Sequence, residues 1–383
     1  MNSTTTATND LNTCKSSNRT ASTQKAMPGC KILARGLIST APARKTCSKS
    51  GCPASREHSP VARESYSFNP SNPLDARTWN SFGFRPPSRI EGKLTAIRTL
   101  PATVNIHLNR ACNFGCRYCY AEFAELSVGM IPPNELREIL AAIAAAPLPA
   151  GIAQRKVNFA GGEPLLYPQI IAMIEYAHSL GLKTSIVTNG SRLTPETLAR
   201  LSLSLDILTL SVDSTDPATS ARIGRSPKNS TKPAPDYESI ATEATRLGIR
   251  VKINTVVNRF NVTENLGTAL LRFTPIRWKI LQAKRVAGQN DAEFEEVAAT
   301  DSEFIEYVAR QKAIVGDAFP VVPETAEEMS GSYAMIAPNG CFFDSSAGRH
   351  HYGRRILSHG IVTAFQDVDF SESKFVERGG IYE

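Results

Sequence analysis

The hydrophobic pattern from about residue 103 onward alternates between two periods. Short runs rich in β-branched residues are followed by longer segments in which apolar residues recur every three or four positions. The strand candidates are Val104–Leu108, Lys156–Phe159, Thr184–Val187, Ile207–Val212, Val251–Val257 and Trp278–Leu281. Helical spacing follows at Leu136, Ile139, Leu140 and Ile143, and again from Ile170 to Gly181. Consecutive βα units predict an α/β fold whose parallel sheet curves into a full or partial (βα)6 barrel.

The pattern stops on both sides of this region. Residues 1–60 contain 18 Ser or Thr, a composition that buries too little apolar surface to offset the entropy of ordering. We therefore expect residues 1–95 to be a disordered tail and linker, and residues 96–285 to form the barrel. Residues 286–383 form a C-terminal extension that closes the site, with an acidic helix at Asp301–Lys312 and a Gly/Ser/His/Arg-rich segment at Gly340–Arg355.

The positive charge of the chain lies in the tail. The formal net charge is +7. Residues 1–60 hold 9 Lys or Arg against 2 Asp or Glu, so they account for 9 − 2 = +7, and the remaining residues balance at 34 basic and 34 acidic. A protein that binds a nucleic acid polymer carries its basic surface on the folded part. No such partner is expected here.

Cellular location depends on how the tail is interpreted. No signal-peptide pattern opens the chain, which favours a reducing, cytoplasmic compartment. The basic, acid-poor stretch Lys31–Lys45 resembles a mitochondrial transit peptide, and a mitochondrial location stays open as the alternative. The most apolar stretch, Leu136–Ile152, is interrupted by Arg137 and Pro147. No membrane partner is expected, because a span needs about 18 or more apolar residues and residues 1–60 show no sustained apolar face.

Three cysteines follow the first predicted strand at close spacing. Cys112, Cys116 and Cys119 form a C-x3-C-x2-C motif. Three thiolates leave one iron of a [4Fe–4S] cluster without a protein ligand, and the amino and carboxylate groups of S-adenosylmethionine (SAM) chelate such an iron. Structural zinc is the alternative, but it requires four protein ligands. Cys341 with His350 and His351 is better explained as loop structure than as a second metal site.

Small and polar residues also follow the next three strands. The second strand ends in Gly161, Gly162 and Glu163, where a carboxylate and glycines permit close approach to the methionine amino group. Thr188 and Asn189 end the third strand, and Ser211–Ser214 ends the fourth. Read alone, each of these is also a common turn or helix cap. Parallel sheets collect their active sites at these strand ends, which favours a ligand site.

Cationic residues alternate along the last two strands. Lys252 points the same way as Asn254, and Arg277 the same way as Lys279, because side chains two apart share a face of a strand. Lys156 at the second strand joins them. Directed into the barrel, these groups predict a multivalent anion site. The alternative is exposed strand ends that form weak surface ion pairs.

Taken together, the motifs resemble the viperin-like radical SAM enzymes over residues 103–285, with further patches near the C-terminus. The stretches that carry the resemblance are Asn105–His107, Val157–Pro164, Ser185–Ser191, Ile223–Arg225, Lys252–Val262, Arg277–Lys279, Ser332–Tyr333 and Arg378–Tyr382. Such enzymes dehydrate a pyrimidine nucleoside triphosphate to its 3′-deoxy-3′,4′-didehydro analogue, an antiviral chain terminator. The resemblance implies a radical SAM barrel and CTP as substrate, with UTP as the alternative.

The resemblance also implies roles for individual residues. SAM is expected at Tyr118, Gly161, Gly162, Glu163, Thr188, Asn189, Ser211 and Arg225. The triphosphate is expected at Asn105, Lys156, Lys252, Asn254, Arg277 and Lys279, with Tyr333 beside them. A 5′-deoxyadenosyl radical would take the hydrogen from C4′ of the ribose, and the 3′-hydroxyl would leave as water with one further electron and a proton. Tyr333 is the expected source of that proton, and Lys252 is the second residue assigned to catalysis.

Other interpretations remain open at this point. The chain could be a radical SAM enzyme that matures a peptide or a cofactor, although such peptide enzymes usually carry additional cysteine-rich segments. It could also be an iron–sulfur carrier or a zinc-stabilised binding module. We expect a monomer that receives electrons from a flavodoxin or a reductase.

Overall fold

The computed structural model describes residues 98–228 and 234–382. The disordered tail and linker predicted for residues 1–95 lie outside this part of the chain. Within it, a single sheet of ten strands runs in the order β10-β9-β8-β1-β2-β3-β4-β5-β6-β7. Its two edges do not pair with each other, so the barrel is partial.

All of the predicted strands are present, and each bound lies within one residue of its prediction. They are β1 (Thr103–His107), β2 (Lys156–Ala160), β3 (Lys183–Thr188), β4 (Ile207–Ser211), β5 (Arg250–Val257) and β6 (Arg277–Gln282). Neighbouring strands of this set pair in parallel. The parallel sheet of a radical SAM barrel is therefore confirmed.

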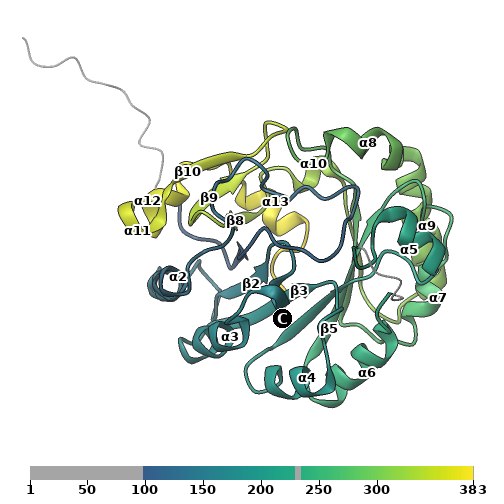
Figure 1. The fold of residues 1–383 in the computed structure, drawn as a ribbon, viewed down its shortest axis with the longest axis horizontal. Coiled ribbons are helices and arrows are strands. Elements are labelled where there is room, and N and C mark those ends of the chain that lie inside the picture. The colour runs from purple at the N-terminus through teal and green to yellow at the C-terminus, as the bar shows by residue number, and fades with distance from the viewer. Residues whose placement is uncertain (1–97, 229–233, 383) are drawn as a thin grey trace, which may run out of the picture. The chain divides into compact units, whose positions relative to one another are not determined.

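Helices connect the parallel strands and cover the outer face of the sheet (Figure 1). The helices are α2 (Pro133–Ala145), α3 (Ile170–Ser179), α4 (Pro195–Leu201), α5 (Pro217–Ile223), α6 (Tyr237–Arg246), α7 (Leu266–Leu270), α8 (Asp291–Val297) and α9 (Asp301–Val315). Helix α9 was predicted from its acidic pattern. It begins with a capping box in which the Thr300 side chain accepts from the Glu303 backbone and the Glu303 side chain accepts from the Thr300 backbone.

The two faces of the sheet differ in polarity. On β1, Val104 and Ile106 are fully buried in the core that includes Leu136 and Ile139 of α2. Each such side chain contributes roughly 1.5–3 kcal/mol by leaving water. Asn105 and His107 alternate with them and line a cavity on the inner face. The period-2 alternation therefore puts apolar residues under the helices and polar residues inside the barrel.

The C-terminal extension adds strands to both edges of this sheet. Strand β7 (Val321–Glu324) pairs in parallel with β6, and β8 (Ala334–Ile336) pairs in parallel with β1. Strands β9 (Cys341–Asp344) and β10 (His351–Arg355) form an antiparallel pair beyond β8. Our expectation of loop structure around Cys341 and His351 was therefore wrong. The free edge of β8 supplies a hydrogen-bonding template that local composition did not reveal.

Four short helices complete the extension: α10 (Ala326–Met329), α11 (Ile356–His359), α12 (Ile361–Phe365) and α13 (Glu372–Glu377). No helix in the described part of the chain is long and apolar enough to cross a membrane.

Candidate active site

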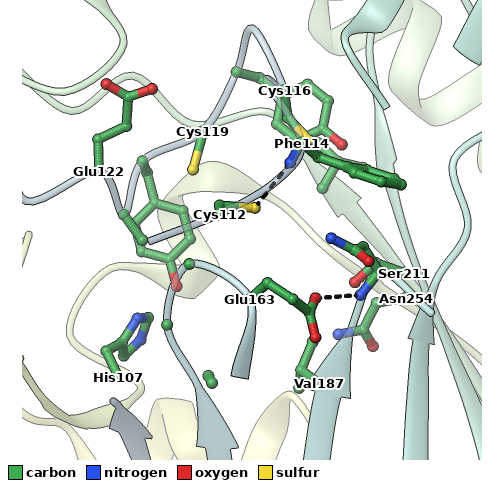
Figure 2. Close-up of a pocket in the computed structure, with 18 of the residues that line it drawn as sticks. His107, Cys112, Phe114, Cys116, Cys119, Glu122, Glu163, Val187, Ser211 and Asn254 are labelled. Atoms are coloured by element: carbon green, nitrogen blue, oxygen red, sulfur yellow. Dashed lines mark hydrogen bonds between the residues drawn. The ribbon is translucent and has the colours of Figure 1, made fainter. Parts of the chain in front are cut away.

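A cavity of about 460 Å³ opens at the carboxyl ends of the parallel strands. Its walls bring together most of the residues predicted at the strand ends. They include Cys112, Cys116, Cys119, Tyr118, Gly161, Gly162, Glu163, Thr188, Asn189, Ser211 and Arg225. Figure 2 shows the three cysteines on the loop above Glu163, with Ser211 and Asn254 on the strands beside it.

The cysteines occupy the loop that follows β1. This loop is held by backbone hydrogen bonds, including Gly115 N to Gly224 O at 3.1 Å. Gly224 has φ +80, and a Cβ there would lie 2.0 Å from the Gly115 carbonyl, so only glycine fits. The described residues contain no group of three His, Cys, Asp or Glu side chains that could hold one metal ion. The C-x3-C-x2-C set suits a [4Fe–4S] cluster, in which each thiolate binds a different iron.

Burial affects the acidity of these thiols. It raises the pKa of Cys116 to about 11 and that of Cys119 to about 12, and it also raises the pKa of Cys112. The thiols are therefore protonated when no metal is bound. Binding of iron releases these protons, because the thiolate is the metal ligand.

Glu163 is held rigidly at the end of β2. It is 1% exposed, and its carboxylate accepts from Thr188 Oγ1 at 2.6 Å, from Asn189 N at 2.8 Å and from Leu165 N at 3.1 Å. Burial raises its pKa in spite of these hydrogen bonds. A Cβ at Gly162 would lie 2.2 Å from the Ala111 carbonyl. The glycine therefore lets the Glu163 turn pack directly against the cysteine loop.

Arg225 belongs to a buried network on the other side of the cavity. Its Nε donates to Asp213 Oδ2 at 2.8 Å, and its Nη2 donates to the Tyr118 hydroxyl at 2.6 Å. Tyr118 in turn donates to Asp213. Asp213 also accepts from the Val256 backbone N–H at 2.8 Å. This carboxylate fixes both predicted SAM residues before any ligand arrives.

The predicted cationic residues lie deeper, near the amino ends of the strands. Lys156, Lys252, Arg277 and Lys279 are 4%, 6%, 7% and 4% exposed. Lys252 is opposite Arg277 in the register of β5 and β6, and Asn254 is opposite Lys279. The alternative that these charges form exposed surface pairs is therefore wrong. None of the four lines the upper cavity, although Asn105 and Asn254 do.

The extension covers this cationic end. The Tyr382 ring centroid lies 3.3 Å from Lys156 Nζ, 4.6 Å from Arg277 Cζ and 5.4 Å from Lys252 Nζ. Burial lowers the pKa of Lys156 to about 8 and that of Lys252 to about 7. The pKa values fall because burial removes water from the ammonium groups and neighbouring cations repel their charge.

One carboxylate, Glu324 at the end of β7, pairs with this group of cations. It is fully buried and pairs with Lys279 and, at 3.4 Å, with Arg378. The Tyr333 hydroxyl donates to Glu324 and accepts from Lys279 Nζ at 2.9 Å. Burial lowers the pKa of Lys279 well below its ordinary value and raises the pKa of Tyr333 well above its own.

Sequence reasoning missed several of these residues. Asp213 was assigned no role, although a carboxylate directly after a strand is a signal for a site residue. No sequence signal identified Glu324, because it lies in the extension, far from the cationic residues in sequence. Asn158 and His107 alternate with buried residues on their strands and could have been found by the alternation that identified Lys252 and Asn254.

These features together are those of a radical SAM enzyme. They are the parallel sheet, the cysteine loop after its first strand, and the hydrogen-bonded Glu163 and Arg225 in the cavity. Residues 106–265 match the family model described as the radical SAM superfamily. The fold is similar to that of SuiB from Streptococcus suis bound to S-adenosylmethionine, with a TM-score of 0.54 and 15% identity, over 73% of this chain and 68% of that one. Its cofactors are accordingly a [4Fe–4S] cluster and SAM.

Sequence comparison specifies the family further. The chain is 37% identical to an S-adenosylmethionine-dependent nucleotide dehydratase from Lacinutrix mariniflava, over 76% of this chain and 60% of that protein. It is 35% identical to a protein of the same description from Flammeovirga pacifica, over 76% of this chain and 99% of that protein. This chain therefore belongs to the viperin-like S-adenosylmethionine-dependent nucleotide dehydratases, which are lyase-type enzymes.

Proposed function

We propose that this enzyme dehydrates a pyrimidine nucleoside triphosphate, with CTP preferred over UTP, to the 3′-deoxy-3′,4′-didehydro nucleotide. Such a product terminates chain synthesis by polymerases and serves antiviral defence. Cys112, Cys116 and Cys119 hold the cluster, and the strand-end groups around Glu163 and Arg225 hold SAM. The relatives described as nucleotide dehydratases support the substrate class.

The observation that carries the substrate assignment is an excess of buried positive charge. Lys156, Lys252, Arg277, Lys279 and Arg378 gather around Tyr382 and Tyr333 with Glu324 as their carboxylate in the described residues. Buried charges are costly unless they are paired. A triphosphate, with about four negative charges and many acceptor oxygens, matches an Arg fork and Lys point charges. A peptide or a neutral sugar does not.

A cluster on Cys112, Cys116 and Cys119, with SAM beside Glu163 and Arg225, would supply the 5′-deoxyadenosyl radical chemistry that removes the C4′ hydrogen of the ribose. The protein then has to hold the nucleotide and provide a proton as the 3′-hydroxyl leaves. Tyr333 fits this role because Lys279 and Glu324 orient its hydroxyl, and because it lines the cavity. Lys252, whose pKa is about 7, gains a proton when it pairs with phosphate and so anchors the substrate during the step.

The remaining partners are assigned from the chemistry. The reaction consumes one electron to cleave SAM and one to complete the loss of water, so an electron donor such as a flavodoxin or a reductase is required. We propose a cytoplasmic monomer, with a mitochondrial location through the basic tail as the alternative.

The alternative function, maturation of a peptide, has less support. The likeness to SuiB concerns the fold alone at 15% identity. Among the described residues, Cys341 is the one cysteine besides the three of the C-x3-C-x2-C motif.

The direct test is anaerobic reconstitution with iron, sulfide and SAM, followed by reaction with each nucleotide. We expect SAM cleavage to rise with CTP and the nucleotide product to be lighter than CTP by one water. Tyr333→Phe should retain CTP binding and SAM cleavage but form the dehydrated product slowly. Equal SAM cleavage with CTP, cytidine and no nucleotide would contradict the proposed function.

A further inference from the structure

Three polar side chains in the barrel contain buried atoms that lack a hydrogen-bond partner among the described residues. The atoms are His107 Nδ1, Asn158 Oδ1 and Asn254 Oδ1. All three residues line the cavity. A buried polar atom without a partner costs free energy, and such atoms are rare in folded proteins. Other unpartnered atoms of the described residues lie outside this cavity, but these three are in position to exchange hydrogen bonds with a ligand inside it.

These groups lie in layers above the cations. Lys156 and Asn158 are two residues apart on β2, as are Lys252 and Asn254 on β5, so each pair faces the same way. Asn105 on β1 is opposite Asn158 in the register. A layer of amides therefore separates the cationic end from the cysteine loop. His107 is the next inward residue of β1 and lies at the strand end below that loop (Figure 2).

The amide of Asn158 is oriented by a chain of hydrogen bonds. Asn105 Nδ2 donates to the Ala334 carbonyl at 3.2 Å, and Asn158 Nδ2 donates to Asn105 Oδ1 at 2.9 Å. The Oδ1 atom of Asn158 has no partner among the described residues, and it is an acceptor. A triphosphate offers acceptor oxygens and cannot pair with it. The ligand group at this layer must contain a hydrogen-bond donor.

His107 is neutral in this environment. It is 4% exposed, and burial together with His350 lowers its pKa to about 3. Aromatic rings of Tyr120, Phe123 and Phe343 surround it at centroid distances of 6.2, 5.4 and 5.2 Å. A phenylalanine would suit such surroundings better than an imidazole. A neutral imidazole offers one donor and one acceptor, the combination that pairs with a hydroxyl group.

We infer that His107 and Asn158 bind the ribose hydroxyls of the nucleotide. This inference rests on the proposed function, since a triphosphate held by the cations puts the ribose beside the next layer. Apart from Tyr118 on the cysteine loop, the residues expected for SAM follow β2, β3 and β4, whereas His107 ends β1 and packs against Phe343 of the extension. Hydroxyl groups both donate and accept, so the ribose diol matches an amide oxygen and a neutral imidazole.

The test compares His107→Phe and Asn158→Leu, which conserve shape and remove hydrogen bonding, in the reconstituted full-length enzyme with SAM. His178→Phe is the matched control, because His178 is exposed on α3. Calorimetry under anaerobic conditions gives the affinities for CTP, 2′-deoxy-CTP and 3′-deoxy-CTP. We expect each variant to bind CTP about tenfold more weakly. The loss should shrink for the analogue that lacks the contacted hydroxyl, whereas SAM affinity and cluster absorbance stay unchanged.

Thermal unfolding without nucleotide supplies a second readout. Replacing a buried, unpaired polar group by an apolar group of similar shape is neutral or stabilising, so His107→Phe should not lower Tm. His107→Asn keeps a hydrogen-bonding side chain and should therefore bind CTP more tightly than His107→Phe does. A lowered Tm with unchanged CTP affinity would make His107 a structural residue and overturn the inference. An equal loss for CTP and both deoxy analogues would also overturn it. Failure of the wild-type enzyme to bind any nucleoside triphosphate would instead refute the proposed function.

Discussion

The two ends of the barrel differ in how their buried charges are paired. At the cysteine end, Glu163 accepts three hydrogen bonds and Arg225 is paired with Asp213. At the amino ends of the strands, buried cations outnumber their carboxylate Glu324, and aromatic rings cover them. The charged groups Glu163 and Arg225 at the cysteine end are already paired within the protein, so this end is preorganised. The second end has an electrostatic deficit that an anionic ligand would remove.

The largest expected effect separates the cysteine end from the rest of the molecule. Cys112→Ala, Cys116→Ala and Cys119→Ala should each abolish the cluster and all SAM cleavage, because no other thiol of the described residues lies in this cavity. Iron content, visible absorbance and 5′-deoxyadenosine formation measure the loss. Full cluster absorbance and SAM cleavage in all three variants would refute the assignment. Cys341→Ala is the control that should keep both.

The next largest effect is a loss of triphosphate affinity at the cationic end that leaves the cysteine end unchanged. Arg277→Ala or Lys279→Ala should weaken triphosphate binding by roughly 2–3 kcal/mol, the scale of one lost charge-assisted contact, and leave the cluster intact. Stimulation of SAM cleavage should decrease from triphosphate to diphosphate to monophosphate. Arg250→Ala, at the half-buried start of β5, is the control. Unchanged CTP affinity in both variants, or equal stimulation by CTP, CMP and cytidine, would rule out this site for the triphosphate.

A smaller effect depends on pH and has opposite signs for folding and for binding. The pKa of Lys252 is about 7 in the folded protein against 10.5 ordinarily. Between these values the unfolded state binds more protons, so the stability of the nucleotide-free protein should rise with pH, by at most about 1.4 kcal/mol per pH unit for this group. Bound phosphate favours the protonated lysine, so CTP affinity should fall over the same window.

Denaturant titrations and binding isotherms from pH 6.5 to 9.5 measure both trends. Lys252→Met should flatten both slopes at this position and leave the weaker contribution of Lys156, whose pKa is about 8. If stability and CTP affinity of the wild-type enzyme changed with pH in the same direction, the cationic residues would not lack a negative partner in the nucleotide-free protein.

The smallest effect concerns the basic tail. Residues 1–60 carry the net charge of the chain, but their composition disfavours a packed core. Deletion of residues 1–60 should leave kcat and the CTP affinity of the purified, reconstituted enzyme unchanged. Loss of turnover would show that the positive charge of the tail, and not only the cations inside the barrel, serves the substrate.

The sequence alone determined the sheet and both ends of the cavity in outline. Strand alternation predicted six parallel strands to within one residue and the inward direction of Lys252 and Lys279, because period 2 is a local property. The spacing of Cys112, Cys116 and Cys119 defined the cluster loop without any long-range information. Tertiary structure alone decided which groups pair across the sheet.

Glu324 meets Lys279 and Tyr382 covers Lys156 because the extension folds back as edge strands and a closing segment. No local pattern encodes these contacts, since they join segments that are far apart in sequence. The strands at Cys341 and His351 were missed for the same reason: their hydrogen bonds depend on the edge of a sheet that exists only after the barrel has formed.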